Sequence, residues 1–165
     1  MDAAETGKTL DALIDSGKVL AVGISNFEVW DWRLLQSHMK HPLVVNQVEM
    51  SLLNRDVFTN GTLSAIQLDG LTPMAWSPLA GGALFQNSAA TTRLAPIFER
   101  ICKQQNCSVD QAAIAWLLAH PANILPVVGT NHPDRVKTLS KAMDVHIDRE
   151  TWFEMLTAAA GHEVP

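Results

Sequence analysis

Strand-like and helix-like segments alternate along the whole chain of 165 residues, and this alternation constrains the fold more than any other feature. Alternating strands and helices favour a parallel sheet covered by helices. Short apolar runs predict the strands, and helical periodicity and capping residues predict the segments between them. The predicted strands are residues 19–24, 43–48, 72–76 and 124–128, the first of them buried on both faces.

Spacing and capping residues predict where the helices begin and end. Ser108 is followed three residues later by Gln111, the spacing of a capping box. Pro133 suits the first position of a helix, Asp148 is a suitable cap for the last helix, and Gly161 suits its end. Residues 77–92 have the Gly and Pro content of a loop. The predicted helices cover about 3–16, from Trp30 to a point before Pro42, 56–68, 93–105, 108–120, 133 onward and 149–160.

The number of strands leaves two architectures open. Four strands can form a small open sheet, or they can be half of an eight-stranded (β/α)8 barrel, which typically needs ~250 residues. With 165 residues the chain is too short for the whole barrel. If it is half of one, two strand edges and one wall of the interior lack partners, which favours association.

Composition excludes several classes of protein. Apolar residues make up 47% and charged residues 18%, so the chain can bury a core, and a net charge of −5 argues against a nucleic-acid binder. We expect no membrane span and no signal peptide, because no long apolar run is present and Met1-Asp2-Ala3-Ala4-Glu5 lacks a basic start. Two cysteines without CxxC spacing predict a reduced, cytoplasmic context. The chain contains no tyrosine, so a tyrosine proton donor cannot come from these residues.

Polar residues accompany the first two predicted strands. Ser25 and Asn26 follow the first strand, where they either present hydroxyl and amide groups to a ligand or cap the next helix. Asn46, Gln47 and Glu49 interrupt the second strand. Buried polar groups need partners, so these residues are either paired within the core or directed at a ligand.

The other two loops combine an aromatic ring, glycines and a cation. Trp76 offers a flat face for stacking, and Gly81 and Gly82 allow close approach of backbone to a ligand; the alternative is a core Trp and an ordinary turn. Arg135 falls in the first turn of a helix, where the helix N-terminus and a guanidinium favour phosphate binding. The alternative for Arg135 is an ion pair with a nearby acid such as Asp134 or Asp144.

Metal sites and nucleophiles have weaker support. His38 and His41 lie three residues apart, but no nearby Cys or acid completes a ligand set, so we expect no metal. Cys102 and Cys107 are expected to be buried thiols, not nucleophiles. Neither GxSxG nor a P-loop motif is present.

Four motifs accompany the predicted strands, in this order along the chain: Gly17-Lys18-Val19 with Gly23-Ile24-Ser25-Asn26-Phe27, Asn46-Gln47-Val48-Glu49, Ala75-Trp76-Ser77-Pro78-Leu79-Ala80-Gly81-Gly82, and Pro126-Val127-Val128-Gly129-Thr130 with Arg135. Together they resemble the aldo-keto reductase family, and the resemblance covers nearly the whole chain. It implies the second half of a (β/α)8 barrel, forming one C-terminal half-barrel domain over residues 1–165. The closing Gly161-His162-Glu163-Val164-Pro165 resembles the terminus of a bacterial oxidoreductase subgroup.

The resemblance implies an NADPH-binding role for the matching positions, because the family reduces aldehydes and ketones with NADPH. Ser25, Asn26 and Gln47 would hold the nicotinamide carboxamide, and Trp76 would stack on the nicotinamide ring. The pyrophosphate would lie against Ser77, Pro78, Leu79, Ala80 and Gly81. The 2′-phosphate end of the adenosine would be bound by Gly129, Thr130, Asn131 and Arg135. Where the family often has a Glu-Asn pair near the adenine, this chain has Thr138 and Leu139.

The resemblance also implies that the catalytic residues are absent here. The family's Asp, Tyr, Lys and His lie on the first half of the barrel, so we expect no reductase activity from this chain alone, and a carbonyl substrate only when an N-terminal half is supplied. One alternative is a non-catalytic half-barrel that binds a partner or self-associates through its open strand edges. Another is the product of a truncated or damaged gene. No nucleic-acid or membrane partner is expected.

Overall fold

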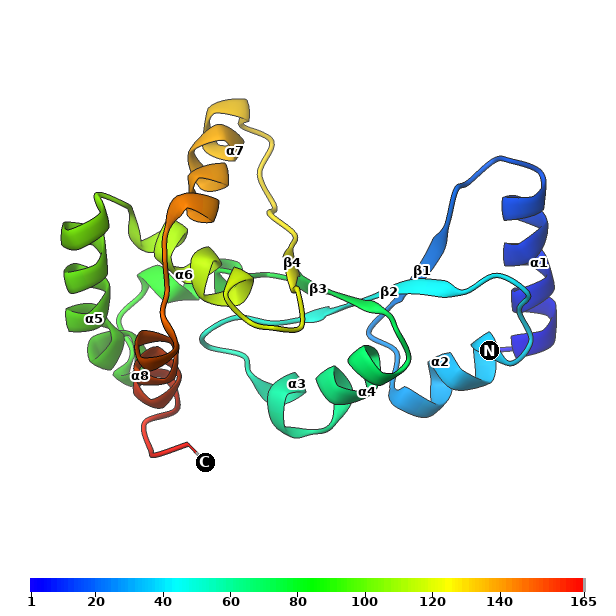
Figure 1. Cartoon of the computed structure of the whole chain (residues 1–165), viewed down its shortest axis with the longest axis horizontal. Coiled ribbons are helices and arrows are strands. Elements are labelled where there is room, and N and C mark those ends of the chain that lie inside the picture. The colour runs from blue at the N-terminus through cyan, green and yellow to red at the C-terminus, as the bar shows by residue number, and fades with distance from the viewer. Residues whose placement is uncertain (165) are drawn as a thin grey trace. The chain divides into compact units, whose positions relative to one another are not determined.

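The computed structural model describes residues 1–164, so Pro165 of the closing motif lies outside the described residues. Its strands form one parallel sheet in the order β1-β2-β3-β4 (Figure 1). The strands are β1 (Val22–Ser25), β2 (Leu43–Glu49), β3 (Thr72–Trp76) and β4 (Leu125–Pro126). In the β1–β2 pair, Ile24 lies opposite Asn46 and Ser25 opposite Gln47. The predicted α/β class with a four-stranded parallel sheet is therefore confirmed.

Helices separate the strands as the sequence predicts. The capping box of Ser108 and Gln111 is present, Asp148 accepts a hydrogen bond from the Thr151 N–H, and Gly161 ends the last helix with φ 81°. The helices are α1 (Ala3–Asp15), α2 (Val29–Gln36), α3 (Asp56–Thr59), α4 (Thr62–Leu68), α5 (Ala89–Gln105), α6 (Val109–Leu118), α7 (Pro133–Ser140) and α8 (Arg149–Ala160). Short 3₁₀ helices η1 (Ala80–Phe85) and η2 (Lys141–Asp144) lie between them.

The predicted first strand is wrong at its start and in its burial. The residues that follow α1 form a turn. In this turn Gly17 has φ 71°, and the Lys18 N–H donates to Leu13 O at 3.1 Å. The strand therefore begins only at Val22, and Leu20 is 98% exposed. Within β1 only Ile24 is buried, so the strand is not covered on both faces.

Three other boundaries differ from the prediction. The predicted helix over 56–68 is divided into α3 and α4, because Gly61 takes a left-handed conformation with φ 85°. The predicted loop over 77–92 contains η1, and α5 begins early because Ser88 and Thr91 form a capping box. β4 has two residues, although the Val127 N–H still donates to Ala75 O at 2.8 Å.

The chain divides into two compact units. The first contains residues 1–48 and 57–74, and the second contains residues 49–56 and the chain from Ala75 onward. The core of the first unit includes Trp32, Leu35 and Ile66, which are almost fully buried. Burial of large apolar side chains of this kind is the main stabilising contribution available to a unit of this size.

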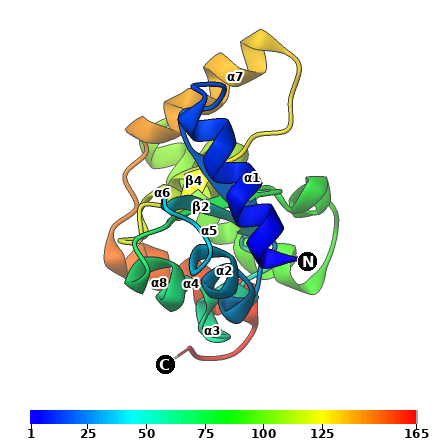
Figure 2. The ribbon, with the colours of Figure 1, turned by 90° about the vertical axis from the view of Figure 1, so that its right-hand side faces the viewer.

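Packing of α5 against α8 dominates the second unit, and the two helices lie side by side in Figure 1. Arg93 of α5 ties them together by donating from Nε to Ala158 O at 2.7 Å. Buried Trp116 of α6 contributes a further large side chain to this core. Figures 1 and 2 show the chain leaving β4 as an extended segment with α7 at its end.

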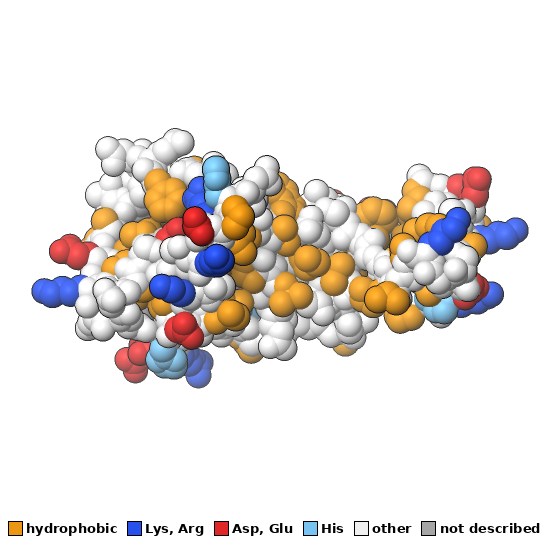
Figure 3. Space-filling view, turned by 90° about the horizontal axis from the view of Figure 1, so that it is seen from above, with side chains coloured by type: hydrophobic (Ala, Val, Ile, Leu, Met, Phe, Trp, Pro, Cys, Tyr) orange, Lys and Arg blue, Asp and Glu red, His pale blue; other side chains and the backbone are white. Residues whose placement is uncertain are grey.

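Charged side chains of both signs are mixed on the surface. On the face seen in Figure 3, Lys and Arg side chains lie among Asp and Glu side chains in each unit. No helix within residues 1–164 is both long enough and apolar enough to cross a bilayer.

Candidate functional site

A cavity of about 510 Å³ in the second unit brings together most of the residues predicted after β3 and β4. The predicted residues on its wall are Trp76, Ser77, Pro78, Leu79, Gly81, Gly129, Thr130 and Arg135. Ala80 and Asn131 lie in the same loops but not on the wall. The structure thus joins an aromatic ring, a glycine-containing turn and a guanidinium in one hollow.

A run of left-handed residues shapes the turn after β3. Ser77, Ala80, Gly81 and Gly82 have φ of 49°, 53°, 60° and 95°. The Ala80 N–H donates to Ser77 O at 2.7 Å, and the Gly82 N–H donates to Leu79 O at 3.0 Å. A Cβ added at Gly81 or Gly82 would meet no atom within 4 Å. The turn therefore presents bare backbone to open space, and the strained conformation at Ser77 and Ala80 is of the kind often found at binding loops.

Several backbone N–H groups at the start of α7 are already hydrogen-bonded within the chain or are absent. The N–H groups of Arg135 and Val136 both donate to His132 O, at 3.0 and 3.2 Å, and Pro133 at the first position has no N–H. The His132 N–H donates to Thr130 Oγ1 at 3.3 Å. Charge from the Arg135 side chain is thus the stronger attraction that this loop offers to an anion.

Arg135 is not used in an ion pair with a neighbouring acid. Asp134 lies 3.8 Å from Lys137 Nζ, and within residues 1–164 no ion pair joins Arg135 to Asp134 or Asp144. The structural alternative considered for Arg135 is therefore not found in the described part of the chain. A cavity-lining guanidinium without a carboxylate partner suits an anionic ligand.

The first unit assembles the other predicted residues around one carbonyl group. Ser25 Oγ donates to Gln47 O at 3.0 Å, and the Asn26 N–H donates to the same oxygen at 2.9 Å. The N-cap of α2 is Glu28, which makes no side-chain capping bond, so the interpretation of Ser25 or Asn26 as the helix cap is wrong. Asn26 has φ 57°, and it turns the chain where β1 ends.

Asn46 also stabilises the loop that follows β1. Its side chain is 0% exposed, and Nδ2 donates to Phe27 O at 3.0 Å. Its Oδ1 is buried and has no hydrogen-bond partner among residues 1–164. Asn46 is thus half-satisfied as a core group, and its amide fixes the loop that carries Ser25 and Asn26.

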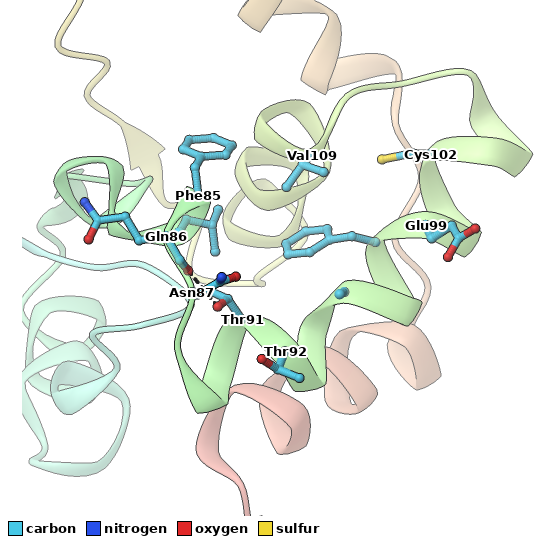
Figure 4. Close-up of a pocket in the computed structure, with 11 residues that line it drawn as sticks. Phe85, Gln86, Asn87, Thr91, Thr92, Glu99, Cys102 and Val109 are labelled. Atoms are coloured by element: carbon cyan, nitrogen blue, oxygen red, sulfur yellow. Dashed lines mark hydrogen bonds between the residues drawn. The ribbon is translucent and has the colours of Figure 1, made fainter.

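A second cavity, of about 500 Å³, lies between η1 and α5 (Figure 4). Phe85 and Phe98 provide much of its apolar wall, and Thr91 Oγ1 donates to Gln86 O at 2.8 Å across one end. Within the described part of the chain, Glu99 is its one charged lining residue, and no Lys or Arg lines it. The cavity at Arg135 is therefore the better candidate for a phosphorylated ligand.

Sequence reasoning did not assign several residues of the Arg135 cavity. Phe85 is 54% exposed and lines both this cavity and the cavity between η1 and α5. An aromatic residue shortly after a glycine pair was the available sequence signal for Phe85. Val127, Val128 and Leu139 also line the cavity, but apolar residues at a strand end and in a helix carry no signal that separates them from core.

The histidines and cysteines identified from sequence have other surroundings. His41 Nε2 lies 2.7 Å from Asp15 Oδ1, and this hydrogen bond lowers the pKa of Asp15. No group of His, Cys, Asp and Glu within residues 1–164 is arranged to hold a metal ion. Cys102 and Cys107 are half-buried free thiols, and burial together with the neighbouring Cys107 raises the pKa of Cys102 to about 11. A thiol with so high a pKa is a poor nucleophile.

Comparison with known proteins decides the family. Residues 1–159 match the profile described as the Aldo/keto reductase family. The chain belongs to the aldo/keto reductase family. It is 55% identical over 164 residues to a 6-dehydroglucose reductase of Agrobacterium fabrum, covering 99% of this chain and 54% of that protein. It is 38% identical over 162 residues to a 6-dehydroglucose reductase of Novosphingobium aromaticivorans, covering 98% and 53%.

A solved structure supports the same aldo/keto reductase assignment. A thermostable aldo-keto reductase crystallised with the inhibitor epalrestat aligns with a TM-score of 0.83 and 25% identity. The alignment covers 96% of this chain and 55% of the solved one. The chain thus spans about half the length of the curated relatives and of the solved structure that it matches.

Proposed function

We propose that this chain forms the NADPH-binding half of an aldo/keto reductase that reduces carbonyl compounds. The observation that carries the proposal is the cavity in which Trp76, the turn from Ser77 to Gly82 and the Arg135 guanidinium meet. These groups match the parts of a phosphorylated dinucleotide: a planar ring, a pyrophosphate and a further phosphate.

The residues on the cavity wall fit such a cofactor in two respects. Gly81, Gly82 and Gly129 leave open space where a side chain would stand, so backbone can approach a pyrophosphate closely. Arg135 would pair with the 2′-phosphate, which distinguishes NADPH from NADH. Leu139 departs from the family pattern, because it places an apolar side chain on the cavity wall where a polar pair is frequent in the family.

Ser25, Asn26 and Gln47 would hold the nicotinamide carboxamide. Ser25 Oγ already donates its proton to Gln47 O, so toward a ligand the hydroxyl oxygen would accept. The side-chain amide of Gln47 can both donate and accept, which is what a carboxamide group requires. The hydrogen bonds from Ser25 Oγ and the Asn26 N–H to Gln47 O fix the backbone positions from which these side chains project.

Bound NADPH would supply a hydride to the carbonyl carbon of the substrate. Reduction also needs a proton at the carbonyl oxygen, and the chain contains no tyrosine to donate it. We therefore expect that this polypeptide alone does not turn over carbonyl substrates. The names of the Agrobacterium and Novosphingobium relatives support a sugar-derived carbonyl compound as the substrate of a complete enzyme.

Titration with NADPH tests the cofactor half of this proposal. Saturable binding by calorimetry is expected for the wild-type chain, about tenfold weaker binding for Trp76→Ala, and unchanged binding for Trp30→Ala, which removes an exposed indole of the first unit. Absence of saturable binding, or equal loss in both variants, would contradict it. A steady-state assay of NADPH oxidation with several aldehydes tests the expected lack of activity. Robust oxidation by the wild-type chain that is abolished in Trp76→Ala would contradict it.

The open sheet edges favour a second role, association with another chain. β1 and β4 are the outer strands of the sheet, and Leu20, Val44 and Leu125 are exposed. Unpaired strand edges and exposed apolar side chains promote pairing. Light scattering after size-exclusion chromatography tests this proposal. A discrete dimer, or a complex with an added first half-barrel, is expected. A stable monomer that does not bind the added half-barrel would contradict the proposal.

A further inference from the structure

A third cavity, of about 480 Å³, lies in the second unit and shares no lining residue with the Arg135 cavity. Aromatic rings and one cation form most of its wall. It is lined by Ala119, His120, Pro121, Ile147, Arg149, Trp152 and Phe153. The reductase role proposed above makes no use of these residues.

Trp152 gives this cavity a rigid, flat wall. Its ring stacks on buried Trp116 with centroids 4.9 Å apart and an interplanar angle of 7°. Trp152 Nε1 donates to Trp116 O at 2.9 Å, and Trp116 Nε1 donates to Trp152 O at 3.1 Å. Because the indole N–H is directed to the core and one ring face is covered, Trp152 offers carbon surface to the cavity.

Two more rings set the shape of the space next to Trp152. Phe153 meets the Trp152 ring edge-on, with centroids 5.1 Å apart at 79°, and the His120 ring lies 5.6 Å away at 53°. The Ala122 N–H donates to His120 Nδ1 at 3.1 Å, and burial lowers the pKa of His120. Since Nδ1 accepts this hydrogen bond, it carries no proton, so the ring is neutral with its proton on Nε2 and adds no charge to the cavity.

Among the described residues that line this cavity, Arg149 is the only charged one. Its guanidinium lies 5.9 Å from the centroid of the Phe153 ring, and within residues 1–164 it forms no ion pair with an acid. Glu150, the next residue of α8, lines a different cavity. The cavity therefore combines flat apolar walls with one positive charge that no carboxylate neutralises.

We propose that this cavity binds a planar aromatic carboxylate. The ring of the ligand would lie against Trp152 and Phe153, where aromatic surfaces contribute both burial and favourable ring geometry. Its carboxylate would pair with Arg149 in a charge-assisted hydrogen bond. Such a site is separate from the cofactor cavity and does not depend on the proposed reductase function.

Calorimetric titration with naphthalene-2-carboxylate tests the site in the full chain. Saturable binding is expected, with about tenfold weaker binding of the neutral amide, naphthalene-2-carboxamide, because it lacks the charge that Arg149 recognises. Cyclohexanecarboxylate, which has the charge but no flat ring, is expected to bind at least as weakly. Equal affinity for all three compounds would overturn the proposal.

Two variants locate the binding. Arg149→Ala is expected to weaken naphthalene-2-carboxylate binding about tenfold and to abolish the preference for the carboxylate over the amide. The control is Lys141→Ala, which removes a cation that does not line the cavity. This variant is expected to leave both the affinity and the preference unchanged. Circular dichroism confirms that both variants are folded. Unchanged affinity in Arg149→Ala, or displacement of the carboxylate by NADPH, would place the ligand elsewhere and refute the site. In an NMR titration, shifts of the Trp152 indole signal that are absent in Arg149→Ala are expected.

Discussion

Ser25 Oγ donates a hydrogen bond to the main-chain oxygen of Gln47 at 3.0 Å, and these two residues lie directly opposite each other in the β1–β2 pair. The Asn26 N–H adds a second bond to the same oxygen. Because strand register determines which residues face each other, the observed register of β1 and β2 fixes the position of this loop. The three polar residues are therefore held at one strand end before any ligand binds.

Arg135 is expected to select NADPH over NADH. Replacing Arg135 with Ala removes a guanidinium without a carboxylate partner from the cavity wall, so the affinity for NADPH falls about tenfold while the affinity for NADH changes little. Calorimetry with both dinucleotides measures the ratio. Lys137→Ala, which removes an exposed cation near Asp134, serves as the control and should leave the ratio unchanged. Equal losses for both dinucleotides in Arg135→Ala would argue against a 2′-phosphate contact.

Gly129 is expected to matter for binding and not for stability. A Cβ at this position would meet no atom within 4 Å, so Gly129→Ala should keep the urea midpoint close to that of the wild type. The added methyl group would occupy space in the cavity, and NADPH affinity is expected to fall several-fold. Gly7→Ala provides the contrast: its Cβ would lie 2.6 Å from His38 O, and a loss of about 1–3 kcal/mol in the free energy of unfolding is expected. A destabilised Gly129→Ala variant with normal affinity would contradict this prediction.

Asp69 makes the stability of the first unit depend on acidic pH. Hydrogen bonds from Arg33 and Trp32 lower the pKa of Asp69, so its contribution is complete above about pH 4, the unfolded value, and is lost as the pH falls through the lower folded value. At pH 7, Asp69→Asn is expected to reduce the free energy of unfolding by roughly 1–3 kcal/mol.

Urea unfolding at several pH values measures the effect of Asp69. The difference between wild type and Asp69→Asn should shrink as the pH falls below about 4. Asp31→Asn, on the first turn of α2, is the control and should show a small difference at all pH values. A difference between wild type and Asp69→Asn that stays constant down to pH 2 would show that the carboxylate charge is not what stabilises this contact.

Cys102 is expected to react slowly with alkylating reagents. Burial is the largest cause of its raised pKa, and burial remains in the Cys107→Ser variant, which leaves Cys102 as the single thiol. Labelling of that variant by iodoacetamide at pH 8 should therefore be several-fold slower than labelling of a cysteine in an unfolded peptide. The rate should rise steeply with pH. Mass spectrometry measures it, and denatured Cys107→Ser, in which burial is lost, should react at the peptide rate. Rapid labelling of the folded variant at pH 8 would contradict the assigned burial effect.

The sequence predicted those elements whose signals are local. The capping box at Ser108, the cap at Asp148 and the helix start at Pro133 depend on residues within one turn, and all are present. The extent of β1 depends instead on where the chain leaves the turn after α1, and β4 depends on where pairing with β3 ends. Neither depends on the residues of the strand alone, so an apolar run overestimates both strands.

The residues of the candidate site also divide into those with a local signal in the sequence and those whose place depends on the rest of the fold. Trp76, Gly81 and Arg135 carry visible chemistry in the sequence, and the structure places them on one cavity wall. Val127, Val128 and Leu139 line that wall as well, but only three-dimensional packing distinguishes them from core residues. The second hydrogen bond to Gln47 O, from the Asn26 main chain, also arises from backbone geometry that side-chain type does not reveal.

The stacked indoles of Trp116 and Trp152 have a practical consequence. Two indoles in contact can couple their electronic transitions, so the part of the dichroism that arises from this coupling is lost when α8 separates from α6. The last helix thus carries an intrinsic optical signal of its own docking, readable without any attached dye.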